Sequence, residues 1–145
     1  MLARLVPSFA LACLLAAGPL APGAAEAETR QGEGYVLEVV APATCKAGAT
    51  STATVKLRPR GAWKLNAAYP FKLELTPAPG VRVAKAVLGK ADARRFGPDG
   101  ADVDVVLTAD KAGRADVAAT VKFATCDEAS CAVHKETFTI SATAQ

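Results

Sequence analysis

Two alternating runs that flank a pair of cysteines constrain the fold of this chain most strongly. Ahead of Cys126, residues 115–123 place alanine, valine and phenylalanine at every second position, with polar residues between most of them. Beyond Cys131, residues 135–142 alternate in the same way, with Phe138 and Ile140 on one side and Lys, Thr and Ser on the other. The pattern predicts an antiparallel hairpin with residues 127–130 at its tip.

The spacing of Cys126 and Cys131 makes the hairpin a geometric requirement if the two are bonded. Residues five apart in an extended chain lie roughly 16 Å apart, whereas a disulfide tolerates a Cα separation of about 4.4–6.8 Å. The bond would close a loop of about six residues, worth about 2 kcal/mol in the chain-entropy model, against about 4.5 kcal/mol for a loop of about 80 residues from Cys45 to Cys126. A purely structural disulfide would stabilise the chain more if it closed a longer loop. The short loop therefore favours a cysteine pair that is retained for its redox chemistry.

The beginning of the chain is typical of a secretory signal peptide. Arg4 precedes the apolar run 5–20, and Ala25-Glu26-Ala27 is a small-x-small cleavage site, so we predict a signal peptide over residues 1–27 and one domain over residues 28–145. The apolar run is too short and interrupted for a membrane span. The expected location is the periplasm or the exterior. A lipoprotein anchored through Cys13 is disfavoured, because Ala10 stands where leucine is usual.

Three cysteines remain after cleavage, in an oxidising compartment. Three single pairings are open among Cys45, Cys126 and Cys131, and the short hairpin favours Cys126–Cys131. Cys45 would then be a spare thiol, expected as a small buried hydrophobic residue near a strand end.

Short alternating segments, and no convincing helix after the signal peptide, predict an all-β fold. Their spacing is typical of an immunoglobulin-like β-sandwich of about seven to eight antiparallel strands. Residues 28–34 are expected to form a loose lead-in, and residues 89–100, rich in glycine and charge, a surface loop. The expected strands are residues 35–41, 49–57, 71–76, 81–87, 103–107, 114–123 and 135–142.

Several classes of function are disfavoured by the composition. The net charge of +3 is spread along the chain and aromatic residues are few, so nucleic-acid binding is not expected. Cys126, Cys131 and His134 with a distant Cys45 would make a Cys₃His zinc set, but there is no Cys-x₂-Cys knuckle and export favours oxidation. His134 is expected as a surface strand residue. No metal, cofactor or small-molecule substrate is predicted, and a single histidine with no nucleophile-elbow spacing disfavours hydrolase activity.

Three stretches carry a resemblance to a known family: Gly61-Ala62-Trp63-Lys64-Leu65-Asn66 followed by Tyr69-Pro70, the loop through Phe96-Gly97, and Phe123-Ala124-Thr125-Cys126-Asp127-Glu128-Ala129-Ser130-Cys131. Together they resemble the N-terminal periplasmic domain of the thiol:disulfide interchange protein DsbD. The resemblance implies an immunoglobulin-like sandwich whose late hairpin bears an exchanging cysteine pair, here Cys126 and Cys131. It also implies that Phe96 is a cap-loop aromatic that shields the pair.

The partners implied by the resemblance are thioredoxin-like or other periplasmic proteins, with a membrane thiol relay acting in trans, because the family's membrane and thioredoxin portions are absent from this sequence. The residues after the second cysteine, Ala132-Val133-His134-Lys135, also depart from the family pattern.

Two hypotheses follow from the sequence. The first is an exported thiol–disulfide exchange module that passes electrons to or from partner proteins through its Cys-x₄-Cys hairpin. The alternative is a non-catalytic secreted sandwich that binds or scaffolds another protein, with the same cysteines as a structural disulfide. Asp127 and Glu128 should raise the pKa of Cys126, while nearby cations should lower that of either sulfur, so the charges leave open which cysteine attacks.

Overall fold

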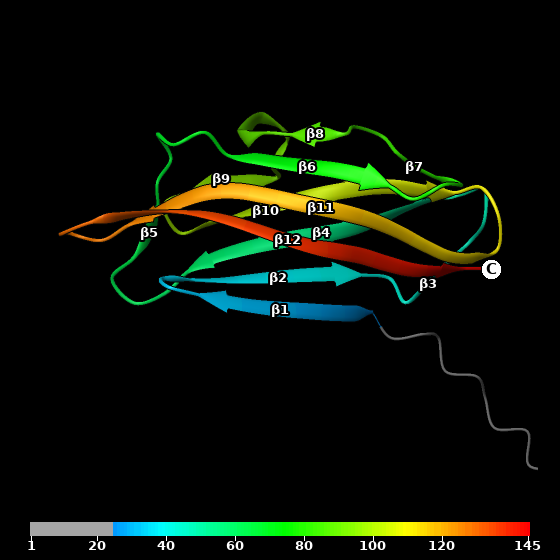
Figure 1. Ribbon diagram of the computed structural model, residues 1–145, viewed down its shortest axis with the longest axis horizontal. Coiled ribbons are helices and arrows are strands. Elements are labelled where there is room, and N and C mark those ends of the chain that lie inside the picture. Colours follow the sequence, from blue (N-terminus) through cyan, green and yellow to red (C-terminus); the bar gives the residue numbers. More distant parts are fainter. Residues whose placement is uncertain (1–24) are drawn as a thin grey trace, which may run out of the picture.

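Two six-stranded sheets pack face to face in an immunoglobulin-like β-sandwich (Figure 1). The computed structural model describes residues 25–145. The first sheet has the order β1-β2-β4-β10-β7, with β9 also pairing with β10. Its strands are β1 (Glu26–Gly32), β2 (Tyr35–Ala41), β4 (Thr50–Pro59), β7 (Val81–Val83), β9 (Arg95–Gly97) and β10 (Gly100–Ala109).

The second sheet has the order β3-β12-β11-β6-β8, with β5 also pairing with β11. All its pairings are antiparallel except that of β3 with β12, which is parallel. Its strands are β3 (Thr44–Cys45), β5 (Lys64–Leu65), β6 (Lys72–Pro77), β8 (Val87–Leu88), β11 (Gly113–Cys126) and β12 (Cys131–Ala144).

The core between the sheets is built by the alternation that the sequence shows. In β2 every second residue from Tyr35 to Ala41 is buried, and in β11 the odd-numbered residues from Ala115 to Thr125 are buried. The largest fully buried side chains come from both sheets: Phe123, Leu37, Leu57, Leu73, Leu107 and Ile140. Each strand therefore has an inner face, which meets the other sheet, and an outer face, which points away from it.

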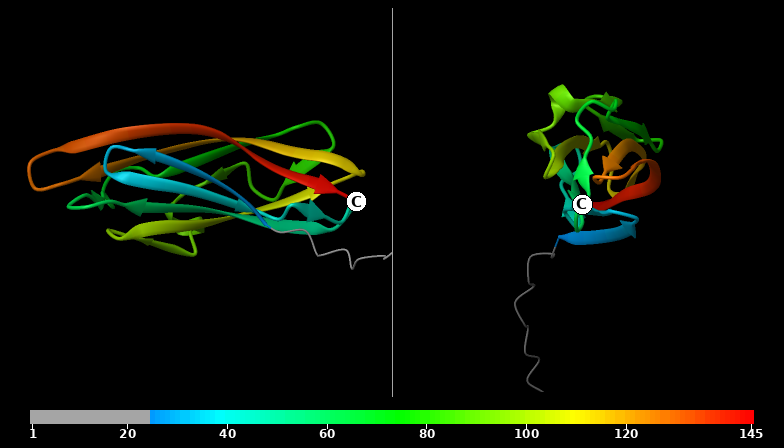
Figure 2. Two further views of the ribbon diagram at one scale, coloured as in Figure 1. Left: turned by 90° about the horizontal axis from the view of Figure 1, so that it is seen from below. Right: turned by 90° about the vertical axis from the view of Figure 1, so that its left-hand side faces the viewer.

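The hairpin of β11 and β12 is the longest feature of the fold, at 14 residues in each strand. Its register runs from the Gly113–Ala144 pair to the Cys126–Cys131 pair without interruption. The views in Figures 1 and 2 agree that its tip reaches beyond the rest of the sandwich. The predicted hairpin is thus confirmed, with the four residues between the cysteines at the tip.

Three sequence-based expectations about local structure are wrong. Residues 28–34 are largely in β1, an edge strand that pairs with β2, because Gly34 with φ 78° allows a tight turn between them. Residues 81–87 are not one strand: β7 pairs with β10 in the first sheet and β8 with β6 in the second, so the chain crosses between the sheets. Residues 89–100 hold a 3₁₀ turn, η1 (Lys90–Asp92), and β9 rather than only loop.

The predicted signal peptide, including Cys13, lies almost wholly outside the described residues. The exceptions are Ala25, Glu26 and Ala27. Glu26 and Ala27 begin β1, so cleavage after Ala27 would shorten that strand. Within residues 25–145, no helix has the length and hydrophobicity needed to span a membrane.

Candidate functional site

A disulfide joins Cys126 and Cys131 at the end of the long hairpin, with an S–S distance of 2.06 Å and a Cα separation of 4.0 Å. The two residues are register partners, so both side chains lie on the outer face of the second sheet. Cys45 is free and buried, and it pairs with Ala144 at the other end of β12. Since 13 residues separate Ala144 from Cys131 along the strand, the thiol lies about 40 Å from the disulfide. Of the three open pairings, the structure contains Cys126–Cys131.

The turn between the cysteines is held by hydrogen bonds of its own. The Asp127 carboxylate accepts backbone N–H bonds from Ala129 (2.8 Å) and Ser130 (2.7 Å), and the Asp127 N–H donates to the Ser130 carbonyl (2.9 Å). The same backbone donors lower the pKa of Asp127 below its ordinary value. The tip therefore has the means to keep its shape whether or not the disulfide is formed.

The two sulfur-bearing residues differ in their surroundings. Cys126 is half-buried and its strand is flanked by β5, whereas Cys131 is exposed. In the described part of the chain, no strand pairs with the outer edge of β12 from Cys131 to Ala142, because β3 covers only Thr143 and Ala144. Cys131 is therefore the more accessible of the two cysteines, and it lies on a strand edge that is unpaired within residues 25–145.

Lys64 is a residue of the site that sequence reasoning did not assign. It is the register partner of Cys126 across β5 and β11, while its neighbour Leu65 is buried opposite Thr125. Lys64 and Cys126 therefore share the outer face as directly opposite residues, a pairing that places Cβ atoms about 4.5–5.5 Å apart. The Lys64 ammonium forms an ion pair of 3.1 Å with Asp99, and both side chains are exposed. The residue opposite Cys126 is thus a lysine whose charge is shared with a carboxylate.

His134 lies on the inner face of the hairpin, away from the disulfide. Its Nε2 is 2.8 Å from the Thr125 hydroxyl, and its ring packs 4.5 Å from the ring of Tyr35 and 5.0 Å from that of Phe123. Burial lowers the pKa of His134, although the carboxylates of Glu136 and Glu33 oppose that shift. The expectation of a surface histidine is wrong, since the ring is half-buried in an aromatic cluster between the sheets.

The Tyr35 hydroxyl completes this cluster by donating a hydrogen bond to the Glu136 carboxylate. Burial, together with this contact, raises the pKa of Tyr35. With His134 on the inner face and Cys45 at the far end, the Cys₃His set does not come together. Among residues 25–145 no group of three or more histidine, cysteine or acidic residues is arranged to hold a metal ion.

Phe96, assigned as a cap-loop aromatic by the resemblance, lies in β9 and packs edge to face against Phe71, with ring centroids 5.3 Å apart. The Lys90 ammonium lies 5.6 Å from the centre of the Phe96 ring. The turn after β9 reaches the site through backbone, because the Leu65 N–H donates to the Pro98 carbonyl at 2.9 Å. The Phe96 segment is thus joined to β5, which in turn pairs with Cys126.

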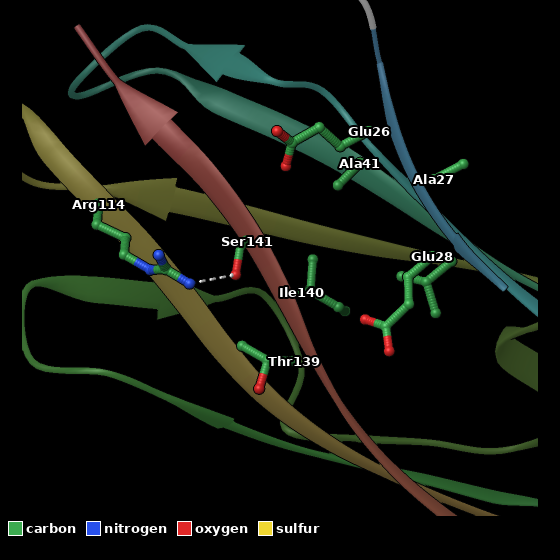
Figure 3. A pocket seen from close by; sticks show the side chains of 9 residues that line it. Glu26, Ala27, Glu28, Ala41, Arg114, Thr139, Ile140 and Ser141 are labelled. Carbon is green, nitrogen blue, oxygen red and sulfur yellow. Dashed lines mark hydrogen bonds between the residues drawn. The ribbon is translucent and has the colours of Figure 1, made fainter. Parts of the chain in front are cut away.

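A cavity of about 380 Å³ lies elsewhere, between β1 and β2 of the first sheet and β12 of the second (Figure 3). Its lining mixes Glu26, Glu28 and Arg114 with the apolar Ala41 and Ile140. Ile140 is nine residues from Cys131 along β12, which is about 30 Å. The cavity is therefore not part of the disulfide site.

Comparisons with known proteins give only distant structural similarity. No family model matches the sequence, and no curated protein matches it. Among solved structures, AggA, the major subunit of aggregative adherence fimbriae type I from Escherichia coli, is similar with a TM-score of 0.42 and 11% identity, over 83% of this chain and 96% of that one. The PapD-like domain 7 of human CEP192 is similar with a TM-score of 0.33 and 14% identity, over 96% of this chain and 98% of that one. At these values neither similarity bears on function.

Proposed function

We propose that this protein is an exported thiol–disulfide exchange module, similar in role to the N-terminal periplasmic domain of DsbD, and that Cys126 and Cys131 are its exchanging pair. Its partners are thioredoxin-like or other periplasmic proteins, with a membrane thiol relay in trans as one source of electrons. The proposal for family and location rests on the sequence motifs. The proposal for chemistry rests on the placement of the disulfide.

The observation that carries the proposal is the position of the disulfide at the exposed tip of a hairpin. Backbone pairing and hydrogen bonds of the turn already hold this hairpin together. The β11–β12 register is continuous up to the cysteines, and Asp127 holds the turn beyond them. A bond that closes so short a loop at the periphery of the sandwich adds about 2 kcal/mol in the chain-entropy model. This position suits a disulfide that partner proteins can reach better than it suits a disulfide that stabilises the fold.

The exposure of the two residues supports a definite order of events. The thiolate of a dithiol partner attacks the Cys131 sulfur, a partner–Cys131 disulfide forms, and Cys126 leaves with the electron pair as a thiolate. Lys64 lies beside that developing negative charge. The partner's second thiolate then attacks its own bridging sulfur, which releases the Cys131 thiolate and leaves the partner oxidised. The reverse sequence oxidises the domain, and the relative reduction potentials set the direction.

The test is a redox equilibrium of the mature protein in graded mixtures of reduced and oxidised glutathione, or of dithiothreitol, with thiols counted by alkylation and intact mass. We expect the reduced protein to carry two more alkyl groups than the oxidised protein, and both to appear together at a potential in the range of periplasmic exchange proteins. Circular dichroism should report an intact fold after reduction. A bridge that opens only under denaturing conditions would instead support the alternative, a non-catalytic binding or scaffold domain with a structural disulfide.

A further inference from the structure

A row of three lysines crosses the outer face of the second sheet beside the candidate site. Lys122 of β11 is the register partner of Lys135 in β12 on one side and of Lys72 in β6 on the other. Directly opposite side chains in antiparallel strands have Cβ atoms about 4.5–5.5 Å apart. Like charges are thus placed next to one another twice in succession, an arrangement that is unfavourable for an isolated sheet. We refer to Lys72, Lys122 and Lys135 as the lysine row.

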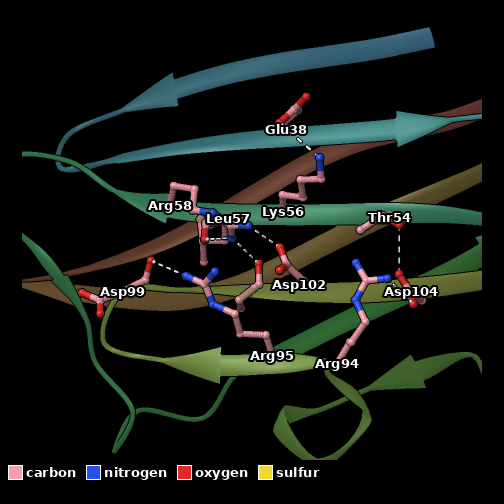
Figure 4. A network of polar contacts seen from close by, with 11 residues as sticks. Glu38, Thr54, Lys56, Leu57, Arg58, Arg94, Arg95, Asp99, Asp102 and Asp104 are labelled. Carbon is pink, nitrogen blue, oxygen red and sulfur yellow. Dashed lines mark hydrogen bonds and ion pairs between the residues drawn. The ribbon is translucent and has the colours of Figure 1, made fainter. Parts of the chain in front are cut away.

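The first sheet of the same molecule follows the opposite rule. Its outer face pairs Glu38 with Lys56, and Lys56 with Asp102, in register. Arg58 also bonds Asp102 at 2.6 Å, and Arg94 bonds Asp104 at 3.2 Å (Figure 4). Opposite charges therefore alternate across the first sheet, whereas like charges adjoin in the second.

The charge of the lysine row is only partly balanced from within the protein. Lys72 forms an ion pair with Glu74, and contact with the lysines lowers the pKa of that carboxyl, the hydrogen bond from Lys72 first. In the part of the chain that the structure describes, neither Lys122 nor Lys135 forms an ion pair. The charges of Lys122 and Lys135 are therefore available to solvent or to a partner protein.

The row adjoins the disulfide on the same face. One register step separates the Lys122–Lys135 pair from Ala124–Val133 on this face, and the next step is Cys126–Cys131, so the row lies about 13 Å from the cysteines. Val133, between them, is 64% exposed. An exposed apolar side chain thus lies between the disulfide and two cations that have no ion pair among the described residues, which offers a partner an apolar contact and a complementary charge beside it.

We propose that the lysine row is the docking site for an acidic patch on the redox partner, which it holds about 13 Å from the partner's attacking thiol. This inference rests on the proposed exchange function and names the chemistry of its partner. Complementary charge at the rim of a contact raises the rate of association and excludes partners of the wrong charge, and its effect falls as salt increases.

The test uses two synthetic peptides that carry one cysteine and, four residues away, three glutamates or three glutamines. Each is mixed with the oxidised mature protein, and the rate of mixed-disulfide formation is measured by quenched alkylation at low salt and at about 0.3 M salt. We expect the glutamate peptide to react about fivefold faster at low salt, a difference that two exposed charge pairs would produce. The advantage should disappear at the higher salt.

Matched variants assign the effect to the row. The double variant Lys122→Gln/Lys135→Gln should lose the preference for the glutamate peptide. The control Lys46→Gln/Lys111→Gln removes the same charge from exposed positions remote from the disulfide and should keep the preference. Equal rates for the two peptides in the wild type, or a preference that survives in the row variant, would overturn the inference.

A second readout separates failure of the inference from failure of the proposed function. If neither peptide nor dithiothreitol opens the native disulfide, exchange is wrong, and the row is then tested alone with a glutamate peptide that has serine in place of cysteine. If that peptide binds, and binding requires Lys122 and Lys135, the lysine row is supported as a docking surface for acidic segments. The inference would be contradicted if the protein bound vesicles of anionic phospholipid through the lysine row but did not bind the serine peptide. That result would assign the row to a membrane surface.

Discussion

Lys64 and Cys126 lie directly opposite each other across β5 and β11, on the face of the second sheet that points to solvent. Because β5 is only two residues long, this strand segment brings to the site one exposed cation and one buried leucine. In the proposed exchange, the cation opposite Cys126 would favour its thiolate, while Cys131 is the more exposed of the two cysteines.

The first prediction concerns the thiol pKa of Cys126. A unit charge about 6 Å away in water changes an ionisation by about 0.7 kcal/mol, or roughly half a pH unit. We therefore expect Lys64→Met to raise the Cys126 pKa by about half a unit, and Lys64→Arg to restore it. The measurement is the pH dependence of alkylation in the reduced Cys131→Ala variant. An identical profile for all three proteins would remove Lys64 from the site.

The second prediction concerns the stability that the disulfide provides. Loss of the short loop in Cys126→Ser/Cys131→Ser should cost about 2 kcal/mol in urea unfolding and leave the fold intact. Asp127→Ala, which removes the acceptor of two backbone bonds at the tip, should cost about 1 kcal/mol. A much larger loss for the cysteine variant, or loss of its fold, would favour a structural role for the bond.

The third prediction concerns Gly34, whose φ is 78° and which lies under the ring of Trp63. A Cβ built there would be 2.5 Å from the ring, so Gly34→Ala combines backbone strain with a clash. Gly48 has a φ of 79° with nothing within 4 Å and is the matched control. We expect Gly48→Ala to cost about 1 kcal/mol by chemical denaturation and Gly34→Ala about 2 kcal/mol or more. Equal losses of unfolding free energy in the two variants would mean that the clash with Trp63 does not affect stability.

The fourth prediction follows from the lowered pKa of His134. The unfolded chain binds a proton near the ordinary pKa of 6.5, while the folded protein resists protonation until a lower pH. The contribution of His134 to stability is therefore complete above the unfolded pKa and is lost as pH falls towards the folded one. Urea unfolding should show stability falling between about pH 7.5 and about pH 5.5, before carboxylates titrate. His134→Phe should flatten that slope, and an unchanged slope would assign it to other groups.

The sequence predicted the features that depend on local alternation. The hairpin, its tip and its cysteine pair follow from residues close together in the chain, as does the all-β fold. The Lys64–Cys126 pairing and the place of Lys72 in the lysine row could not be predicted, because each depends on the register between strands distant in sequence. The Lys122–Lys135 pair, in contrast, follows from the register of the predicted hairpin. The inner-face position of His134 was within reach, since it is an even number of residues from Phe138 and Ile140 in one alternating strand.

Two other differences have physical reasons that propensity does not show. Residues 81–87 alternate like one strand, yet their hydrogen bonds divide between β10 and β6. Residues 28–34 look like a polar lead-in because an edge strand needs little hydrophobic surface, and β1 is mostly exposed. The role of Phe96 stays a prediction, since its ring packs against Phe71 and its segment reaches the site only through β5.

The position of Cys45 sets a condition on how the chain matures. Its backbone carbonyl accepts a hydrogen bond from the Gln145 N–H, and its strand partner is Ala144, so the residues that pair with Cys45 are synthesised long after it. If the chain is exported as proposed, Cys45 meets a compartment that oxidises thiols while it is still unfolded, together with Cys126 and Cys131. In that case, rapid docking of β3 against β12 would limit the formation of wrong disulfides. We expect slow folding variants to accumulate isomers with the wrong disulfide, which a disulfide isomerase would have to correct.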